Sequence, residues 1–357
     1  MLKNTHIWLP EYIRQALTPR PKVKGPRHIL FCFVDHFEPD WNNAGIELQR
    51  ERIDAWISKY PSAAAGHKDA DGRYPQHTFF YPAEMYLAEH LDKLSRLCRE
   101  GFGETEIHLH HDNDNAVTLK EKLLRAREDF LRHGLIGRNR DTGEPAYAFI
   151  HGNWSLNNSR GDGRWCGVDH ESEVLVETGC YADFTYPSAP SDTQTGTINR
   201  IYYDVNRGKK SHNTGKEATA GRAVHGRLML IQGPLCLNWK RRKYGLVPRI
   251  ENGDVTGHNH PTKDRVDLWI NRGIGVKGRE DWIFVKVHTH GAVEKNADAL
   301  LGRPVADMLT YLEGHYNDGR EYILHYVTAR EMYNIAKAAE AGLSGDPNEY
   351  RDYLIVK

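Results

Sequence analysis

The sequence has little of what would commit a chain to a membrane, an oxidising compartment or a nucleic acid. No apolar run approaches the roughly 18 residues of a transmembrane helix, and the mean hydropathy is -0.67. The five cysteines form no CxxC pair, which favours reduced thiols in a cytosol. Lys plus Arg and Asp plus Glu both number 48, so the formal charge is zero and the basic excess of nucleic-acid or anionic-membrane binders is missing.

Targeting and nucleotide-binding motifs are missing as well. Residues 1–25 have no unbroken apolar segment and no small-residue cleavage site, so we expect no secretory signal and a cytoplasmic protein. There is no GxGxxG after a predicted strand, no GxxxxGK(S/T) loop and no GxSxG elbow. Nucleotide binding through those loops and catalysis by a serine elbow are therefore unsupported.

Histidine, tryptophan and tyrosine are abundant instead, with 20, 8 and 18 residues in a chain of 357. An excess of histidine suits metal chemistry, and an excess of Trp and Tyr suits stacking on sugar rings or other flat apolar faces. With 39% hydrophobic and 27% charged residues the composition is otherwise ordinary for a globular protein. Disorder is thus excluded as a description of the whole chain.

The first 151 residues alternate strand-like and helix-like segments. Continuous apolar runs are typical of strands buried on both faces, and alternation of strands with helices predicts a parallel sheet or barrel. We expect strands at 28–35, 76–81, 106–110 and 146–151, with helices near 46–60, 83–99 and 118–133.

The remainder of the chain is less regular. Residues 155–226 are rich in Gly, Asn, Ser and Asp, and an irregular stretch of that length is usually functional or an insertion. Strand-like runs resume at 228–231 and 281–288, and two helices are expected near 297–313 and 329–342.

Four polar clusters lie at the carboxyl ends of predicted strands. A single histidine at such a place is more often a loop or capping residue, but the carboxyl ends of parallel strands line one ligand site. Four clusters there are harder to explain by chance. They are Asp35-His36-Phe37-Glu38, His108 to Asp114, His151 to Trp154, and His288-Thr289-His290.

Strand alternation groups these side chains further. His108 and His110 share one face of their strand, as do His288 and His290 with Lys286. Imidazole and carboxylate ligands fit a borderline metal such as zinc, whose catalytic sites keep one position open for water. The bound water becomes a nucleophile near neutral pH, a carboxylate takes its proton, and an imidazole protonates the leaving group.

A basic run between aromatic residues, Trp239 to Tyr244, is a second candidate region. One interpretation is a solvated loop, and the other is contact with an anion or a sugar at the rim of the site, made by Arg241 and Arg242. His151, Asn153 and Trp154 are further candidates for contact with the substrate.

The order of these motifs resembles the polysaccharide deacetylase family (NodB homology, carbohydrate esterase family four) over residues 28–291. Phe33-Val34-Asp35-His36-Phe37 stands where the family has Thr-Phe-Asp-Asp-Gly, and His77-Thr78-Phe79-Phe80 is similar to its Ala-Thr-Phe-Phe strand. Glu106 to Asp114 is similar to the family's Glu-Ile-Gly-x-His-Ser/Thr-x-x-His, and Val285 to His288 to its final Leu-x-His. The family's Arg-x-Pro motif is replaced by Ile150 to Trp154.

The resemblance implies an α/β fold, a deformed (β/α) barrel of about seven parallel strands (NodB-like) with a large loop insertion. It places an N-terminal arm at 1–25, the barrel at 26–330 with the insertion at about 186–265, and a C-terminal helix and tail at 331–357. We expect the insertion to cover the site and to set its specificity.

The activity implied by the resemblance is metal-dependent removal of an N-acetyl group from an amino sugar. The family's ligands, one Asp and two His, correspond to His36, His110 and Asp114, with the residue types exchanged in place. Asp35 corresponds to the base and His288 to the acid, with His290 as its rival.

Zinc is the expected metal, and the expected partner is a carbohydrate or acylated amino-sugar substrate with an anionic part. Two alternatives stay open: a metal-dependent glycosidase or other C–N hydrolase on the same fold, and a sugar-binding protein without catalysis. The sequence leaves the oligomeric state undetermined.

Overall fold

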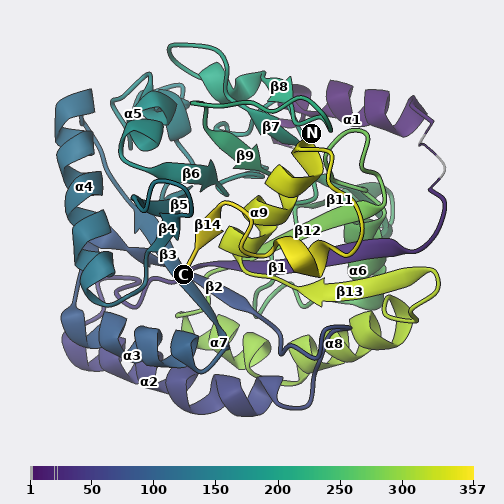
Figure 1. Ribbon diagram of the computed structural model, residues 1–357, viewed down its shortest axis with the longest axis horizontal. Coiled ribbons are helices and arrows are strands. Elements are labelled where there is room, and N and C mark those ends of the chain that lie inside the picture. Colours follow the sequence, from purple (N-terminus) through teal and green to yellow (C-terminus); the bar gives the residue numbers. More distant parts are fainter. Residues whose placement is uncertain (1–2, 20, 22) are drawn as a thin grey trace.

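A mostly parallel β-sheet forms the centre of the computed structural model, which describes residues 3–19, 21 and 23–357 (Figure 1). Starting from β1, the longest strand, the parallel strands lie in the sheet in the order in which they occur in the chain. The exceptions are β12 and β13, which both pair with β1. In sheet order the parallel strands are β12 (Trp282–Thr289), β1 (Arg27–His36), β2 (His77–Pro82), β3 (Gly103–Leu109), β5 (Pro145–His151), β6 (Cys180–Asp183) and β9 (Met229–Ile231), with β13 (Tyr322–Tyr326) also paired to β1.

Antiparallel strands extend this sheet at its margins. β7 (Ile201–Tyr203) pairs with β9 and with β8 (Lys216–Glu217), while β4 (Gly137–Asn139) joins β5 to β14 (Ile355–Val356). The expected α/β fold is confirmed. The expected closed barrel of about seven strands is not: within the described residues the sheet has 12 strands and is not closed. The reason is that β6 pairs with β9, which pairs with β7, and the order runs on to β8 instead of returning to β12.

The expected helices near 46–60, 83–99, 118–133 and 329–342 are present, while the helices Leu9–Leu17, Glu171–Glu177 and Lys263–Ile270 are not among those expected from the sequence. The expected helix at 297–313 is interrupted at Gly302, where a Cβ atom would lie 2.4 Å from the Asp298 carbonyl oxygen. None of the helices in the described part of the chain is long and apolar enough to cross a membrane. They are α1 (Leu9–Leu17), α2 (Ile46–Ala64), α3 (Ala88–Arg99), α4 (Ala116–Arg132), α5 (Glu171–Glu177), α6 (Lys263–Ile270), α7 (Glu294–Leu300), α8 (Arg303–His315) and α9 (Ala329–Glu340).

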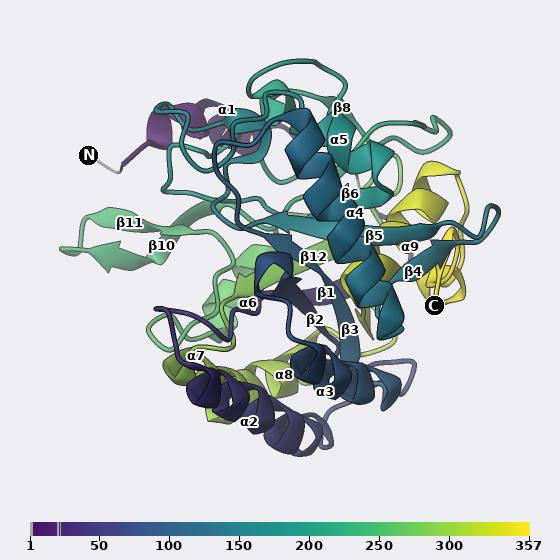
Figure 2. The same ribbon diagram turned by 90° about the vertical axis from the view of Figure 1, so that its left-hand side faces the viewer.

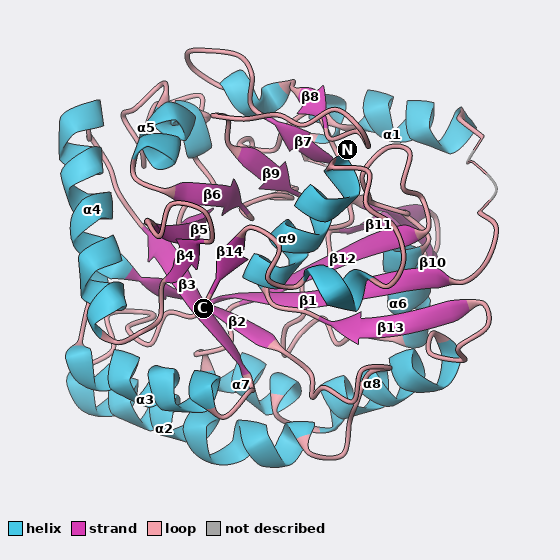
Figure 3. Cartoon of the chain, viewed as in Figure 1, coloured by secondary structure: helices cyan, strands magenta, loops and turns pink. Residues whose placement is uncertain are grey.

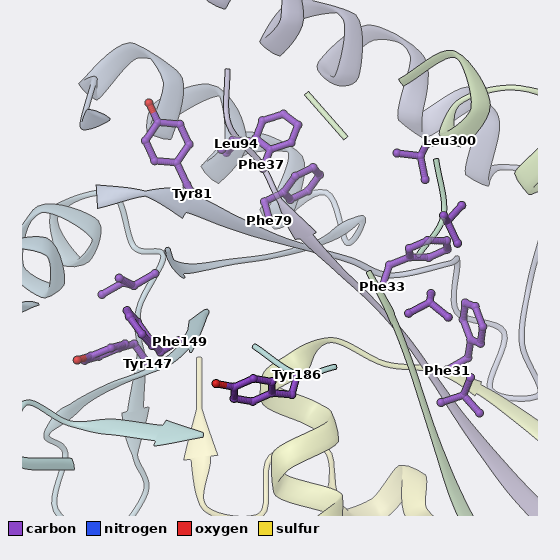
Figure 4. Packing of buried hydrophobic residues seen from close by; sticks show 14 of the residues in the cluster. Phe31, Phe33, Phe37, Phe79, Tyr81, Leu94, Tyr147, Phe149, Tyr186 and Leu300 are labelled. Carbon is purple, nitrogen blue, oxygen red and sulfur yellow. The ribbon is translucent and has the colours of Figure 1, made fainter. Parts of the chain in front are cut away.

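Each face of the sheet has its own apolar core, because neighbouring side chains of a strand point to opposite faces. Phe31, Phe33 and Phe149 belong to the larger core, which includes residues of α2 to α8 (Figure 4). Cys32 and Val34 belong to the second core, which is completed by α9. Figure 1 shows α9 lying across the middle of the sheet, so the segment 331–357 is integrated into the fold.

The segment 186–265 is more than a loop insertion. It supplies β7, β8 and β9 to the central sheet, joined by long loops (Figure 3). It also forms a separate hairpin of β10 (Cys236–Lys243) and β11 (Val247–Glu251), which projects from the body of the protein (Figure 2).

The N-terminal arm is tied to this part of the chain. Trp8 is fully buried in a small core with Ala189, Ile198 and Leu235. Pro10 occupies the first turn of α1, where proline is tolerated because the N–H it lacks has no helical partner there.

Candidate metal centre

Four histidine side chains surround one carboxylate, that of Glu38, at the carboxyl ends of β1, β3 and β12. His36 ends β1 and Glu38 follows two residues later; His108 and His110 come from the end of β3, and His290 lies just beyond β12. The ligand atoms of His36, Glu38 and His290 lie within 4.8 Å of one another, as do those of Glu38, His108 and His110. We call these five residues the Glu38 cluster.

Glu38 contacts three imidazoles directly. Its Oε1 atom lies 3.2 Å from His108 Nε2 and 3.0 Å from His110 Nε2, and its Oε2 atom lies 2.9 Å from His290 Nδ1. The His36 ring packs between two of these, with ring centroids 4.8 Å from His108 and 4.6 Å from His290. Only 5% of the Glu38 side chain is exposed, so the carboxylate depends on these groups for its stabilisation.

Hydrogen bonds at the Nδ1 atoms fix the orientation of the His108 and His110 rings. His108 Nδ1 lies 3.0 Å from the Ile150 carbonyl oxygen, and His110 Nδ1 lies 2.6 Å from Glu84 Oε1. Both partners accept hydrogen bonds, so in each ring the proton sits on Nδ1 and the Nε2 lone pair faces Glu38. A lone pair facing a carboxylate at about 3 Å requires a shared cation, either an extra proton or a metal ion.

The charges agree with this requirement. Burial opposes ionisation of Glu38, but hydrogen bonds from His108, His110 and His290 hold its pKa well below its ordinary value. For His110, burial is outweighed by hydrogen bonds to Glu38 and Glu84, which raise its pKa to about 10. Burial, then His290 and His108, lowers the pKa of His36, whose Nδ1 is buried without a hydrogen-bond partner. Without a metal, His110 therefore carries an extra proton between Glu38 and Glu84, and a divalent ion at Nε2 would take the place of that proton.

This donor set fits a borderline divalent metal. Imidazole nitrogen with carboxylate oxygen suits zinc and neighbouring first-row ions, and the cluster contains no sulfur. The outer partners of His108 and His110 are of the kind that orient metal-binding histidines.

Aromatic side chains border the cluster. The Trp154 ring centroid lies 5.9 Å from that of His36, and the Trp41 ring centroid lies 5.5 Å from that of His290. Trp41 is 39% exposed. Asp40 is half-buried nearby, and burial together with the charges of Glu38 and Glu84 raises its pKa.

Asp35, expected as the base, lies on the opposite face of β1 from His36. Its Oδ2 atom lies 2.8 Å from His77 Nε2, and its Oδ1 atom accepts the Gly291 N–H at 2.6 Å. A Cβ atom at position 291 would lie 2.1 Å from Asp35 Oδ2, so only glycine fits there. Asp35 therefore positions the loop that follows His290.

An apolar cavity of about 230 Å³ lies on this Asp35 side of β1. Because its lining is largely apolar and lies across the strand from His36, it is separate from the Glu38 cluster. Its lining includes Phe33, Trp56, Tyr60, His77, Leu300 and Leu309.

His288 lies two residues before His290 on β12. It is buried, its Nδ1 has no hydrogen-bond partner, and burial with the charge of Lys286 holds its pKa well below the usual range. Lys286 donates to the carbonyl oxygens of Phe184 and Tyr186 at 2.6 and 2.5 Å.

Asp114, expected as the third ligand, is placed elsewhere. Its carboxylate accepts hydrogen bonds from Lys122 Nζ at 2.7 Å and Thr118 Oγ1 at 2.8 Å, at the start of α4. The carboxylate beside His36 and His110 is Glu38. The sequence prediction did not include Glu38 as a ligand. The signal that could have indicated it is strand alternation, because residues 36 and 38 are two apart and share a face.

The expected substrate residues are divided between three places. His151 ends β5 on the face opposite the Glu38 cluster, and Asn153 donates its N–H to His151 Nδ1 at 3.2 Å. Only Trp154 borders the cluster. Arg241 and Arg242 lie in the projecting hairpin, where they donate to Asn259 Oδ1 at 2.8 Å and to the Trp239 carbonyl oxygen at 2.7 Å.

A chain of contacts links that hairpin to β12. Asn259, which accepts from Arg241, donates to Asp254 Oδ1 at 2.7 Å. Next to it, Val255 donates its N–H to the His288 carbonyl oxygen at 2.8 Å. The base of the hairpin is thus attached to the strand that carries His288 and His290.

A comparison with protein-family models and a search of curated proteins match nothing to this chain, so its chemistry has to follow from the side chains themselves.

Proposed function

We propose that the protein is a metal-dependent hydrolase whose metal is held by the Glu38 cluster. The observation that carries the proposal is the pair of rings, His108 and His110, whose Nε2 atoms face the same Glu38 oxygen while their Nδ1 protons are engaged behind. A divalent cation bound there would polarise the scissile carbonyl and lower the pKa of a water molecule.

The substrate that we propose is an N-acylated amino sugar, with the acetyl group as the part removed. Two features support this choice: the motif order resembles the NodB-type deacetylases, and Trp41 and Trp154 flank the cluster. Indole rings offer flat apolar area to one face of a sugar. Ligands of open α/β sheets also bind at the carboxyl ends of the strands, where the cluster lies.

Proton transfer is assigned to Asp40 and His288. Asp40 is half-buried beside Glu38 and Glu84, and its raised pKa suits a carboxylate that accepts a proton from water. We assign protonation of the leaving amine to His288 rather than to His290, because His290 contacts Glu38. Since burial keeps His288 neutral, it donates only a proton that it has first accepted.

The test combines metal analysis with product analysis. Purified protein is assayed for bound metal and for release of acetate from oligomers of N-acetylated amino sugars. We expect bound metal and acetate release in the wild type. In His110→Ala we expect loss of the metal of the Glu38 cluster and loss of acetate release. The matched control is His225→Ala, because His225 is an exposed histidine outside the clusters.

The alternatives give different products. Cleavage of the sugar chain without acetate would show a glycosidase, and retained metal without any turnover would show a binding protein. Wild-type protein that binds no zinc, manganese or cobalt would contradict the proposal itself.

A further inference from the structure

A second group of metal-ligand side chains lies on the other face of the sheet. His111 follows β3, His151 ends β5, Cys166 lies in the loop between them and α5, and Glu171 is the first residue of α5. All four are buried, and their ligand atoms lie within 4.8 Å of one another. We call them the Cys166 group; it shares no residue with the Glu38 cluster.

Glu171 is the centre of this group. Its Oε1 atom lies 3.2 Å from His111 Nε2, and its Oε2 atom lies 3.3 Å from Cys166 Sγ and 3.8 Å from His151 Nε2. The two imidazole rings lie with their centroids 4.7 Å apart. A carboxylate, a thiol and two imidazoles thus surround one enclosed point.

The backbone holds the group in place. Val168 directs its N–H to Cys166 Sγ at 3.4 Å, and Asn157 donates its N–H to Glu171 Oε2 at 3.0 Å. Gly167 has a φ of +98°, and a Cβ atom there would lie 2.4 Å from the Asp114 carbonyl oxygen. The chain at Cys166 is therefore pressed against the segment that follows His111.

Outer contacts orient His111 toward the centre. Its Nδ1 atom lies 3.1 Å from Asp114 Oδ2, and Asp114 is itself held by Lys122 and Thr118. A carboxylate behind one ring nitrogen leaves the other free for a metal. The carboxylate expected as a ligand of the first centre thus supports a ligand of the second.

The His151 ring has one nitrogen that is hydrogen-bonded and one that is not. Its Nδ1 accepts the N–H groups of Asn153 and Ser155 at 3.2 and 3.4 Å, while its Nε2 is buried without a hydrogen-bond partner and points into the group. Binding through Nε2 needs the proton on that atom to leave. His111 Nε2 and Cys166 Sγ would likewise release a proton to a metal. His111, Cys166 and Glu171 are the three principal ligands because Glu171 lies 3.2 Å from His111 Nε2 and 3.3 Å from Cys166 Sγ but 3.8 Å from His151 Nε2.

We propose that the Cys166 group is a second metal site, structural in character, that binds zinc. Zinc binds cysteine sulfur, histidine nitrogen and carboxylate oxygen, and a closed set of protein ligands is typical of structural zinc, whereas catalytic zinc keeps an open position. The bound ion would tie α5 and the loop after Trp154 to the ends of β3 and β5. The alternative is a metal-free ion-pair network of His111 with Glu171 and Asp114.

The presence of sulfur gives a test that does not depend on hydrolysis. The protein is stripped of metal, loaded with cobalt(II) and examined for a thiolate-to-cobalt charge-transfer band in the near ultraviolet. Among the described residues, the Cys166 group is the one candidate metal site that contains a cysteine, so the band reports on this group and not on the Glu38 cluster. We expect the band in the wild type, its retention in His110→Ala, and its loss in Cys166→Ser.

Metal counting completes the test. We expect two equivalents of zinc in the wild type and one in Cys166→Ser, with two retained in the control Cys98→Ser, whose half-buried thiol contacts Thr105 Oγ1. His151→Ala distinguishes four ligands from three through a shift of the cobalt spectrum. Folded wild-type protein that gives no thiolate band after cobalt loading overturns the proposal even if Cys166→Ser does not fold.

Discussion

The Glu38 cluster and the Cys166 group lie on opposite faces at the same end of the sheet, and adjacent residues serve them: His110 the first and His111 the second. In the Glu38 cluster 33% of the His110 side chain and 19% of the His290 side chain are exposed. In the Cys166 group the side chains of His111 and Glu171 are not exposed at all. The two groups have similar donor residues but differ in exposure to solvent, which indicates different purposes: an open group suits a catalytic metal, and a closed group suits a structural one.

The largest effect is expected from Glu38→Gln. The substitution removes the charge that three histidines share, so we expect loss of the metal of the Glu38 cluster and of acetate release. The Cys166 group should keep its ion. Metal content and kcat/KM measure the two outcomes, and unchanged turnover in Glu38→Gln would contradict the role of the cluster.

Cys166→Ser should reverse the pattern, with activity partly kept and stability lost. A metal present at a hundred to a thousand times its Kd stabilises a fold by roughly 2.7 to 4.1 kcal/mol. We expect a loss of this order in urea unfolding, and a similar loss when a chelator is added to the wild type. Equal stability with and without chelator would show that no structural ion is present.

Asp35→Asn probes the contact that holds the loop after His290. Breaking a buried carboxylate–imidazole pair costs about 3 to 5 kcal/mol when one partner is left uncompensated, and we expect less here because asparagine can still accept the Gly291 N–H. Bound metal should remain while kcat falls. If Asp35→Asn unfolds with the wild-type midpoint, the pair with His77 has no structural role.

Glu84→Gln weakens the orientation of His110 without removing a ligand. Loss of such an outer carboxylate typically lowers metal affinity or activity about 10- to 100-fold. A metal titration followed by competition with a chelator measures the change. Glu89→Gln is the control, because Glu89 pairs only with Arg50 on the surface; equal affinities in the two variants would remove Glu84 from the site.

The smallest effect is expected from Arg241→Gln with Arg242→Gln. Both residues lie in the projecting hairpin, so the free energy of unfolding should change by no more than about 0.5 kcal/mol for each. If the hairpin contacts an anionic part of the substrate, KM rises while kcat is unchanged. An unchanged KM would confine the substrate to the Glu38 cluster and its tryptophans.

Local patterns predicted the strands that carry the Glu38 cluster. The segments 28–35, 76–81, 106–110, 146–151 and 281–288 all contain strands, and the structure buries these strands along almost their whole length. Alternation correctly separated His288 and His290 from the apolar face of β12. Closure of the sheet could not be predicted from local sequence, because it depends on whether β9 leads on to β7 and β8 or pairs with the distant strand β12.

The candidate site was predicted in part. His36, His110 and His290 meet as their positions at strand ends suggested, but Glu38 replaces Asp114 beside them. The choice of Asp114 rested on motif order, whereas its position follows from the start of α4 and from Lys122. The Cys166 group has no motif, since its members come from the ends of β3 and β5, from the loop after Trp154 and from the start of α5, which only the fold brings together.

Metal analysis of three proteins tests the central claim most directly. The wild type, Glu38→Gln and Cys166→Ser are purified in parallel, and their zinc content is measured per chain. Two separate centres predict two equivalents in the wild type and one in each variant, with acetate release surviving only where Glu38 is intact. A wild type without bound metal that also fails to take up zinc would contradict the account.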